Sequence, residues 1–376
     1  MHRRHAIVVL VLAFERAARA GGGAATDSYD DIRSNTPLDL HALTDLYAQY
    51  NFNQPYSSTS QLRAFDANDG LQLNFARLTI AHVPEPFGFR VDVGEGSTPN
   101  GYLDSDPAAT AYPDLSRALS YIEQAFVSVR LHVAKRELDI DVGKFGTPVG
   151  LEDNESQQNW SYSRSLLYTW AEPTYHTGLR VTYALASALA LSAFWVNGWN
   201  ANILEGSGMR TFAVAGTWTP MKSLSVSFAY MGGLERAPTR LGDPTMAWRN
   251  ELDAFATYAL TKRLSLAVTT DYGHDEANDG VWWWGAGGYA RYELAPWLAA
   301  SVRAEELVDP DGFLTGTRQR VAEVTATMEV KEQFSRASVV TRLEYRRDQS
   351  DARVFETATA HATNQDTVTL GVMLFF

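Results

Sequence analysis

The sequence predicts an all-β protein, a transmembrane antiparallel β-barrel of about 16 strands, for three reasons. Segments in which apolar and polar residues alternate repeat along most of the 376-residue chain. The connections between these segments alternate between short and long, as they do in barrels that have tight turns on one side of a membrane. The chain also ends on an apolar stripe, which would leave a soluble protein with an uncovered sheet edge.

Composition excludes several classes of protein. No stretch reaches the roughly 18 apolar residues that a membrane helix needs, so a membrane-spanning chain would have to cross with strands. The absence of cysteine excludes a disulfide scaffold and thiolate chemistry. A formal net charge of −12 argues against binding nucleic acid through counterion release.

The N-terminus has the pattern of an export signal. A positive start at residues 2–5 precedes an apolar run at 6–14, and Ala18-Arg19-Ala20 has a small residue on each side of the central one, as cleavage sites do. We therefore predict a signal peptide over residues 1–20, whose removal would take the formal charge to −15. Because Arg19 and its charged neighbours are unusual before a cleavage site, the exact position of cleavage is not determined. The alternative to a signal peptide is a short buried helix.

After a periplasmic N-terminal segment over 21–37, the barrel is predicted over 38–376. Sixteen alternating segments can be marked there, each near the ten residues of a tilted membrane strand. They are 40–52, 70–83, 86–95, 119–133, 136–146, 174–187, 188–199, 209–220, 222–233, 247–260, 262–274, 281–294, 297–308, 317–331, 335–347 and 366–376. A split or merged pair would change the count to about 14 or 18.

The connections differ by parity. Those after even-numbered segments are short, such as Pro84-Glu85 and Ala134-Lys135, whereas most after odd-numbered segments are long and polar. The long ones include 53–69, 96–118, 147–173, 234–246 and 348–365. This parity predicts short periplasmic turns, long outside loops and two periplasmic chain ends. A β-sandwich also alternates along its strands, but has no reason to separate its loops by parity.

The two faces of each segment differ in polarity. Val302 and Ala304 share one face of the thirteenth segment, whereas Arg303 and Glu305 share the other. In a barrel the apolar face meets lipid and the charged face meets the lumen. The predicted lumen-facing residues are Arg130, Asp139, Asp141, Arg180, Arg291, Arg303, Glu305, Arg342, Glu344 and Arg346. With four further inward acids (Asp253, Asp271, Glu293 and Glu323), the inward acids outnumber the inward bases, which predicts a slight preference for cations.

The last segment contains a candidate assembly signal. Its spacing, Thr369-x-Gly371-x-x-Leu374-x-Phe376, resembles the C-terminal signal that the barrel-assembly machinery of Gram-negative bacteria reads. We expect this segment to close the barrel by pairing with the first one. The alternative is the ordinary last strand of a β-sandwich.

Several elements between residues 141 and 200 carry a family resemblance. In order they are Val142-Gly143-Lys144-Phe145-Gly146, Tyr162-Ser163-Arg164-Ser165, His176-Thr177-Gly178 and Val196-Asn197-Gly198-Trp199. This stretch resembles the β-barrel porin family of the OmpL-like or porin 2 type. The resemblance implies a barrel in the bacterial outer membrane that acts as a channel, and it does not specify a solute.

The long loop 147–173 is a candidate pore constriction. Pro148 and Gly150 turn the chain out of the fifth segment. Four charged residues follow, namely Glu152, Asp153, Glu155 and Arg164. If the loop folds into the barrel, these charges would select solutes by size and charge. If it does not, they are surface charges that face the medium.

No motif for catalysis or for metal binding is present. The sequence lacks HExxH, a P-loop and a GxSxG elbow, and its eight histidines show no metal-ligand spacing. We therefore predict no enzyme activity, no catalytic residue, no metal and no cofactor. The expected function is passive diffusion of small hydrophilic solutes.

Three alternatives stay open. One is a structural or adhesive barrel with a closed lumen, another is a channel specific for a sugar or an ion, and the third is a soluble periplasmic β-rich binding protein. For a barrel, the expected partners are outer-membrane lipid, lipopolysaccharide, the barrel-assembly machinery and the solutes themselves. The sequence does not decide whether the chain forms a homo-oligomer.

Overall fold

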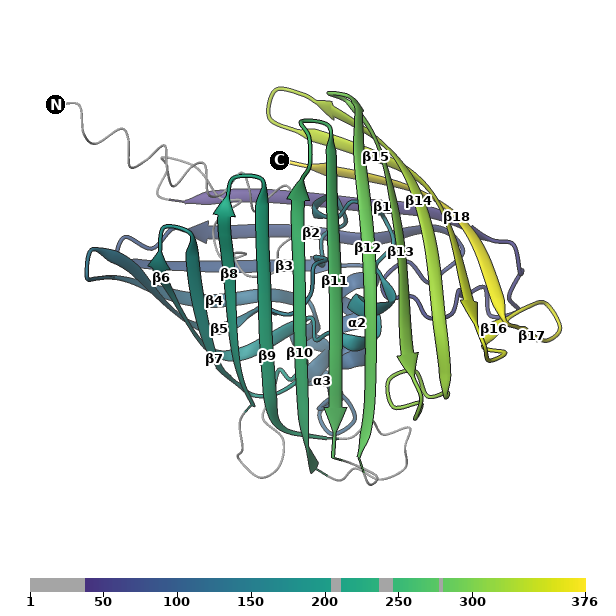
Figure 1. Ribbon diagram of the computed structural model, residues 1–376, viewed down its shortest axis with the longest axis horizontal. Coiled ribbons are helices and arrows are strands. Elements are labelled where there is room, and N and C mark those ends of the chain that lie inside the picture. Colours follow the sequence, from purple (N-terminus) through teal and green to yellow (C-terminus); the bar gives the residue numbers. More distant parts are fainter. Residues whose placement is uncertain (1–37, 204–210, 237–245, 277–279) are drawn as a thin grey trace.

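The computed structural model describes residues 38–203, 211–236, 246–276 and 280–376. These residues form one closed barrel of 16 antiparallel strands, in which each strand pairs with its neighbour in sequence (Figure 1). The predicted fold class and strand number are confirmed. The predicted signal peptide and the periplasmic segment 21–37 lie outside the described residues and stay predictions.

The barrel strands match the predicted segments to within a few residues. They are β1 (Asp39–Asn51), β2 (Gly70–His82), β3 (Phe87–Glu95), β4 (Ile122–Val133), β5 (Arg136–Gly146), β6 (Tyr175–Ala186), β7 (Leu189–Val196), β8 (Thr211–Met221), β9 (Leu224–Arg236), β10 (Met246–Ala259), β11 (Leu264–Asp275), β12 (Val281–Ala295), β13 (Leu298–Asp309), β14 (Gln319–Gln333), β15 (Ser338–Ser350) and β18 (Asn364–Phe375).

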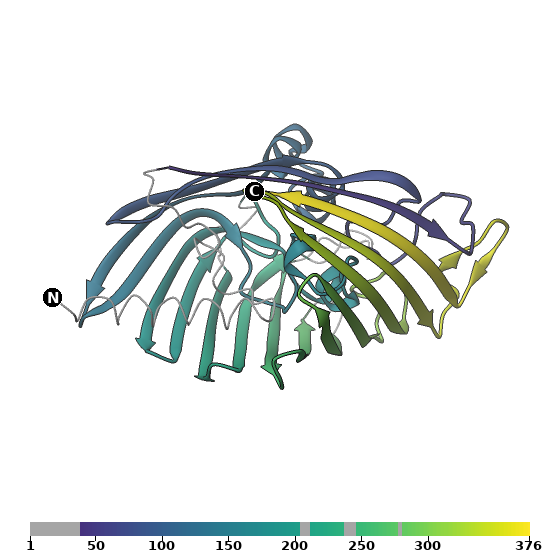
Figure 2. The ribbon, with the colours of Figure 1, turned by 90° about the horizontal axis from the view of Figure 1, so that it is seen from above.

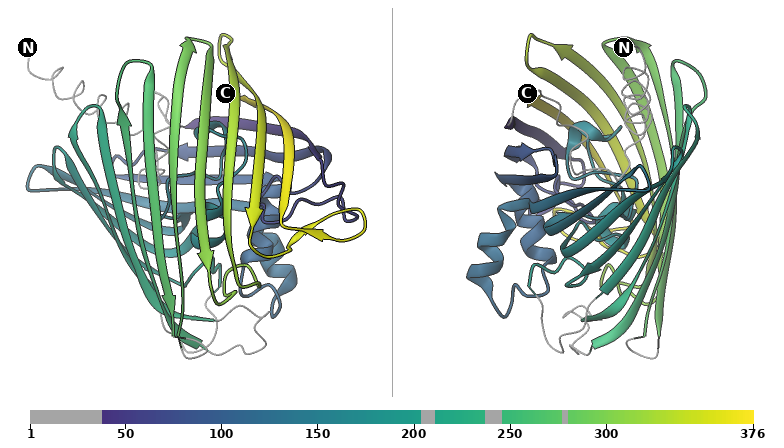
Figure 3. Two further views of the ribbon diagram at one scale, coloured as in Figure 1. Left: turned by 45° about the vertical axis from the view of Figure 1, so that its right-hand side comes forward. Right: turned by 90° about the vertical axis from the view of Figure 1, so that its left-hand side faces the viewer.

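The long loops contain short elements that the sequence did not predict. Two helices, α2 (Ser97–Ser105) and α3 (Pro113–Ser120), connect β3 to β4, and α2 packs against β2 and β3 (Figure 3). Since α3 takes up residues assigned to the fourth strand, β4 begins at Ile122 and not at 119. A small hairpin of β16 (Phe355–Glu356) and β17 (His361–Ala362) lies in the loop before β18.

The C-terminal strand closes the barrel as expected. β18 lies between β15 and β1, and Leu43 is paired with Phe375. The last residue completes the ladder, because the backbone N–H of Phe376 donates to the carbonyl of Ala42 over 3.1 Å and its carbonyl accepts in return over 2.9 Å. The edge left by the apolar terminal stripe is therefore fully paired.

The alternating faces are oriented as the sequence predicts. Val302 and Leu370 are exposed on the outer surface, whereas their neighbours Arg303 and Thr369 point inward and are buried. Trp218 and Trp297 are exposed near the short-turn end, where amphipathic rings suit a membrane–water boundary. Within the described residues, no helix is long and apolar enough to span a membrane.

Candidate functional site: a loop held inside the barrel

The connection from β5 to β6, residues 147–174, runs inside the ring of strands and is called the inner loop below (Figure 2). It contains two short helices, η1 (Ser156–Gln158) and η2 (Leu167–Ala171). Of its residues only Gln158 is exposed, and 161–168 are all buried. A buried loop must find hydrogen-bond partners for its own backbone, because no water can satisfy its polar groups.

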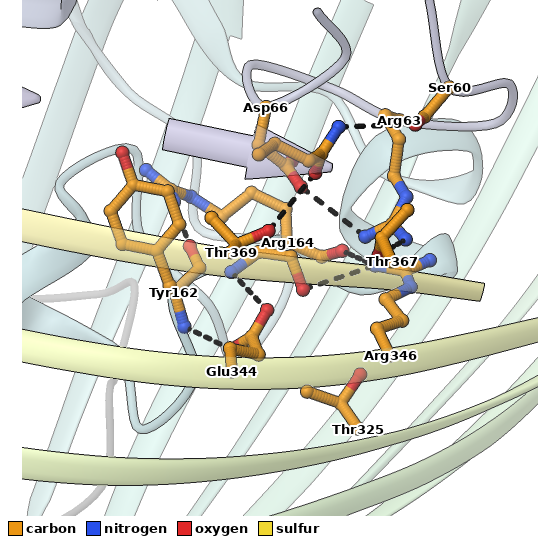
Figure 4. A network of polar contacts seen from close by, with 12 residues as sticks. Ser60, Arg63, Asp66, Tyr162, Arg164, Thr325, Glu344, Arg346, Thr367 and Thr369 are labelled. Atoms are coloured by element: carbon orange, nitrogen blue, oxygen red, sulfur yellow. Dashed lines mark hydrogen bonds and ion pairs between the residues drawn. The ribbon is translucent and has the colours of Figure 1, made fainter. Parts of the chain in front are cut away.

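Carboxylates on the barrel wall accept the backbone N–H groups of the inner loop. Glu344 on β15 accepts from Tyr162 over 2.6 Å and from Ser163 over 3.0 Å (Figure 4). Glu305 on β13 accepts from Leu166. Both carboxylates are buried, so each one replaces the water that would otherwise solvate the loop.

Arginines on the same strands donate to the carbonyls of the inner loop. The pairs are Arg303 with Ser163 (2.7 Å), Arg342 with Ser161 (2.9 Å) and Arg346 with Arg164. The three guanidinium groups are buried. The charged inner face of β13–β15 therefore acts as a solvating surface that holds the inner loop.

The four predicted constriction residues all lie inside the barrel, not on an outer surface. Glu152 is buried, pairs with Arg303 over 2.7 Å and accepts the N–H of Ser165 over 2.7 Å. The partners of the other three are Arg77 for Glu155, the carbonyls of Asp153 and Tyr162 for Arg164, and the N–H of Glu155 for Asp153. Their observed contacts anchor the loop, and their part in a constriction stays a prediction.

The remaining predicted lumen residues form ion pairs along the wall. Arg180 on β6 meets Asp141 on β5 over 2.9 Å. The other pairs are Arg130 with Asp139 (2.7 Å) and Arg291 with Glu329 (2.6 Å). The inner face thus holds matched charges and not isolated ones over these strands.

The inner loop also packs against the last strand. Thr369 and Gly371 of the predicted assembly signal face inward, whereas Leu374 and Phe376 are exposed outside. The ring of Tyr162 lies so close to Gly371 that a Cβ atom there would overlap it. Gly371 therefore has a reason to be glycine that is separate from any signal.

We expect Gly371→Ala to lower the yield of folded barrel, because overpacking against the Tyr162 ring costs about 1–3 kcal/mol. The yield can be measured on gels, since folded barrels migrate differently before and after boiling. The added variant Tyr162→Ala should restore the yield of Gly371→Ala by removing the clash. If the double variant folds as poorly as Gly371→Ala alone, glycine is required here by the C-terminal assembly signal and not by the contact with Tyr162 of the inner loop.

A cavity of about 810 Å³ lies at the loop end of the barrel. Aromatic and charged side chains line it together, from α2, η2 and the wall. They include Phe65, Tyr102, Asp104, Tyr168, Trp170, Glu172, Trp199, Glu235 and Arg249. None of the four predicted constriction residues is among its lining residues, whereas five inner-loop residues between 168 and 174 are. Sequence reasoning missed these because aromatic residues in a loop have no diagnostic spacing.

One further group of charges is not paired with arginine. Carboxylate oxygens of Glu172, Asp253 and Asp271 lie within 4.8 Å of one another, and such a group could hold a metal ion. Burial raises the pKa of Glu172 well above its ordinary value, and the nearby carboxylates of Asp271 and Asp253 raise it further. The sequence prediction of no metal rested on histidine spacing and did not consider this group.

Comparison with known proteins agrees with the geometry. The family model described as "Putative beta-barrel porin-2, OmpL-like" matches residues 37–376. No curated protein sequence matches the chain.

Among solved structures, the outer-membrane expressed OmpT of Vibrio cholerae is 13% identical with a TM-score of 0.58, over 92% of this chain and 100% of that chain. Salmonella typhi OmpF in complex with daunomycin is 12% identical with a TM-score of 0.55, over 90% and 97%. A mutant of the Rh. blastica porin is 14% identical with a TM-score of 0.51, over 90% and 100%. At these identities the likeness shows the barrel fold alone.

Proposed function

Because the chain belongs to the OmpL-like beta-barrel porin-2 family and is an outer-membrane porin, we propose that it passes small hydrophilic solutes by passive diffusion through a lumen that the inner loop narrows. The observation that carries the proposal is the position of residues 147–174, which cross the interior and are held there by the charged wall. A barrel of this strand number encloses a water-filled lumen unless something fills it.

The loop-end cavity supports a small polar solute as cargo. Its volume of about 810 Å³ suits molecules of the size of small ligands. Its lining combines rings such as Trp170 and Trp199 with charged groups such as Arg249 and Glu235. Rings offer apolar faces, and charged groups offer hydrogen bonds, so the entrance suits hydrated solutes with some apolar surface.

We also propose a slight cation preference. The buried wall arginines Arg303, Arg342 and Arg346 are all committed to acids or to loop carbonyls. On the inward faces of the strands the acids outnumber the bases, so the interior carries a net negative charge when these groups are ionised. A negative interior attracts cations and repels anions.

A structural barrel with a closed lumen is the second candidate, and the complete burial of residues 161–168 favours it. A solute-specific channel would share the same geometry. In each case the proposal includes no enzymatic step. Membrane lipid, lipopolysaccharide and the barrel-assembly machinery are the expected partners, and a homo-oligomer stays open.

Swelling of lipid vesicles separates the two candidates. We expect vesicles that contain the folded porin to swell in iso-osmotic solutions of uncharged sugars, quickly with a monosaccharide and more slowly with a trisaccharide, because the inner loop narrows the lumen. Vesicles with boiled protein are the control. Folded porin that causes no swelling with any sugar would favour the closed barrel, and equal rates for all sugars would argue against a narrowed lumen.

A further inference from the structure

Four carboxylates gather where the inner loop returns to the wall. Glu172 comes from the inner loop, Glu251 and Asp253 from β10, and Asp271 from β11. Asp253 and Asp271 are direct partners in the strand ladder, and Glu251 lies two residues before Asp253 and so on the same inward face. We call these four residues the acidic cluster.

The acidic cluster is buried and lacks polar partners. Both carboxylate oxygens of Glu251, Asp253 and Asp271, and Oε2 of Glu172, have no hydrogen-bond partner. The four residues are between 1% and 5% exposed. N–H groups of Gly150 and Trp283 lie near Asp253 and Glu251, but neither forms a hydrogen bond of ordinary geometry with them. The carboxyl groups of Asp253 and Asp271 lie close enough to share a proton, which is the alternative to a bound metal ion.

Within the described residues, arginine compensates this cluster only in part, through the charge of Arg249 near Glu251. Among the described residues, none of its four members forms an ion pair, and the nearby Arg249 pairs with Asp275 over 2.9 Å. This contrasts with the strands β13–β15, where every buried acid has an arginine or a backbone N–H beside it. Buried carboxylates that are neither paired nor hydrogen-bonded are costly, and such groups either take up a proton or coordinate a metal ion.

The distances fit a hard divalent cation. A Ca²⁺ ion binds oxygens at about 2.3–2.6 Å, so two of its ligands lie at most about 5 Å apart. Oxygens of Glu172, Asp253 and Asp271 meet this limit, being within 4.8 Å of one another. A set made only of carboxylates, without histidine or cysteine, suits Ca²⁺ better than a transition metal.

We propose that Glu172, Asp253 and Asp271, with Glu251 beside them, bind a divalent cation, with Ca²⁺ preferred over the smaller Mg²⁺. Glu172 also lines the loop-end cavity, so the acidic cluster borders that cavity. The site can bind its ion whether or not the lumen conducts, but a bound ion would offset part of the negative charge on which the proposed cation preference rests.

A bound ion would fasten the base of the inner loop. Gly150 near its start lies against the Glu172 carboxylate near its end, so closely that a side chain on Gly150 would collide with it. An ion on Glu172 therefore ties both ends of the loop to β10 and β11. The arginines and glutamates of β13–β15 hold its middle, so ion and wall together fix the loop at separate places.

Calorimetry on the folded full-length barrel in detergent, after treatment with a chelator, tests the site with CaCl2 and MgCl2 as separate titrants. We expect one Ca²⁺ per barrel, weaker Mg²⁺ binding, and a higher temperature for the heat-induced gel shift when Ca²⁺ is present. Asp271→Asn should weaken Ca²⁺ binding by more than about ten-fold. Asp139→Asn, an inward acid of β5 that pairs with Arg130, should leave Ca²⁺ binding unchanged.

Glu172→Gln serves as a second variant, because it lies in the loop and leaves the strand ladder untouched if Asp271→Asn fails to fold. Absence of Ca²⁺ binding by the wild-type barrel would overturn the proposal, and would leave a shared proton as the means of neutralising the cluster. Binding that survives both Asp271→Asn and Glu172→Gln would also overturn it, by placing the ion elsewhere. Equal affinities for Mg²⁺ and Ca²⁺ would overturn the calcium preference.

Discussion

Replacing Arg303 by methionine should destabilise the folded barrel by about 3–5 kcal/mol, because the buried acids beside it lose their positively charged partner. The Arg303 side chain is fully buried and lies 2.7 Å from Glu152 of the inner loop and 2.6 Å from Glu323 of β14. It also donates to the carbonyl of Ser163 over 2.7 Å. Methionine keeps an unbranched stem but replaces none of these contacts, so the middle of the inner loop loses its strongest anchor.

Urea unfolding of the barrel in lipid vesicles, followed by tryptophan fluorescence, measures this loss. Arg320→Met is the matched control, because Arg320 on β14 pairs with Glu306 while its side chain is 62% exposed, and such an exposed pair contributes little to stability. The double variant Arg303→Met with Glu323→Gln should regain part of the stability, since it removes one of the buried carboxylates that Arg303→Met leaves unpaired. If Arg303→Met unfolds like Arg320→Met, the buried pairs do not hold the loop.

Removing the inner loop should raise the single-channel conductance several-fold. Residues 152–170 can be replaced by a few glycines and serines, because Gly150 and Glu172 already lie side by side and a short linker joins them without moving the strands. The conductance of a barrel of this width is set by its narrowest cross-section, which the loop reduces if it forms the proposed constriction. The arginines that it leaves behind would be solvated by water in the widened lumen.

The change in conductance can be recorded in planar bilayers under identical salt for both proteins. A variant that shortens the tip of the β16–β17 hairpin, residues 357–360, is the control, since this hairpin lies in another loop and is not part of the inner loop. The control should conduct like the wild-type porin. A loop-deleted barrel that folds and conducts no better than wild type would show that the inner loop does not limit the pore.

The sequence predicts the barrel well because each strand carries its own signal. Alternation, with Val302 and Ala304 outside and Arg303 and Glu305 inside, is local and needs no knowledge of neighbouring strands. The alternation of short and long loops predicts how the strands are connected. The apolar terminal stripe ending at Phe376 predicts that the last strand closes the barrel. Helix α2 was missed for an equally local reason, since Pro99 and Gly101 inside it are poor helix formers.

The inner loop could be located from sequence, but its contacts could not. Glu152 and Arg303 are 151 residues apart in the sequence. No local sequence pattern indicates that the charged side chains of β13–β15 form hydrogen bonds with the backbone of the loop. The acidic cluster is equally non-local, since Glu172 joins Asp253 and Asp271 only after the loop has folded inward. The family resemblance included Tyr162-Ser163-Arg164-Ser165, and the structure gives these residues a physical reason, because they form the buried middle of the loop.

Recording of single wild-type barrels in planar lipid bilayers tests the central claim most directly. A passive porin narrowed by its inner loop should insert in discrete conductance steps, with current proportional to voltage. A reversal potential in a salt gradient should indicate a slight cation preference. Barrels that are shown to be folded by their gel shift, but that insert without any conductance step, would contradict the account and leave a closed structural barrel in its place.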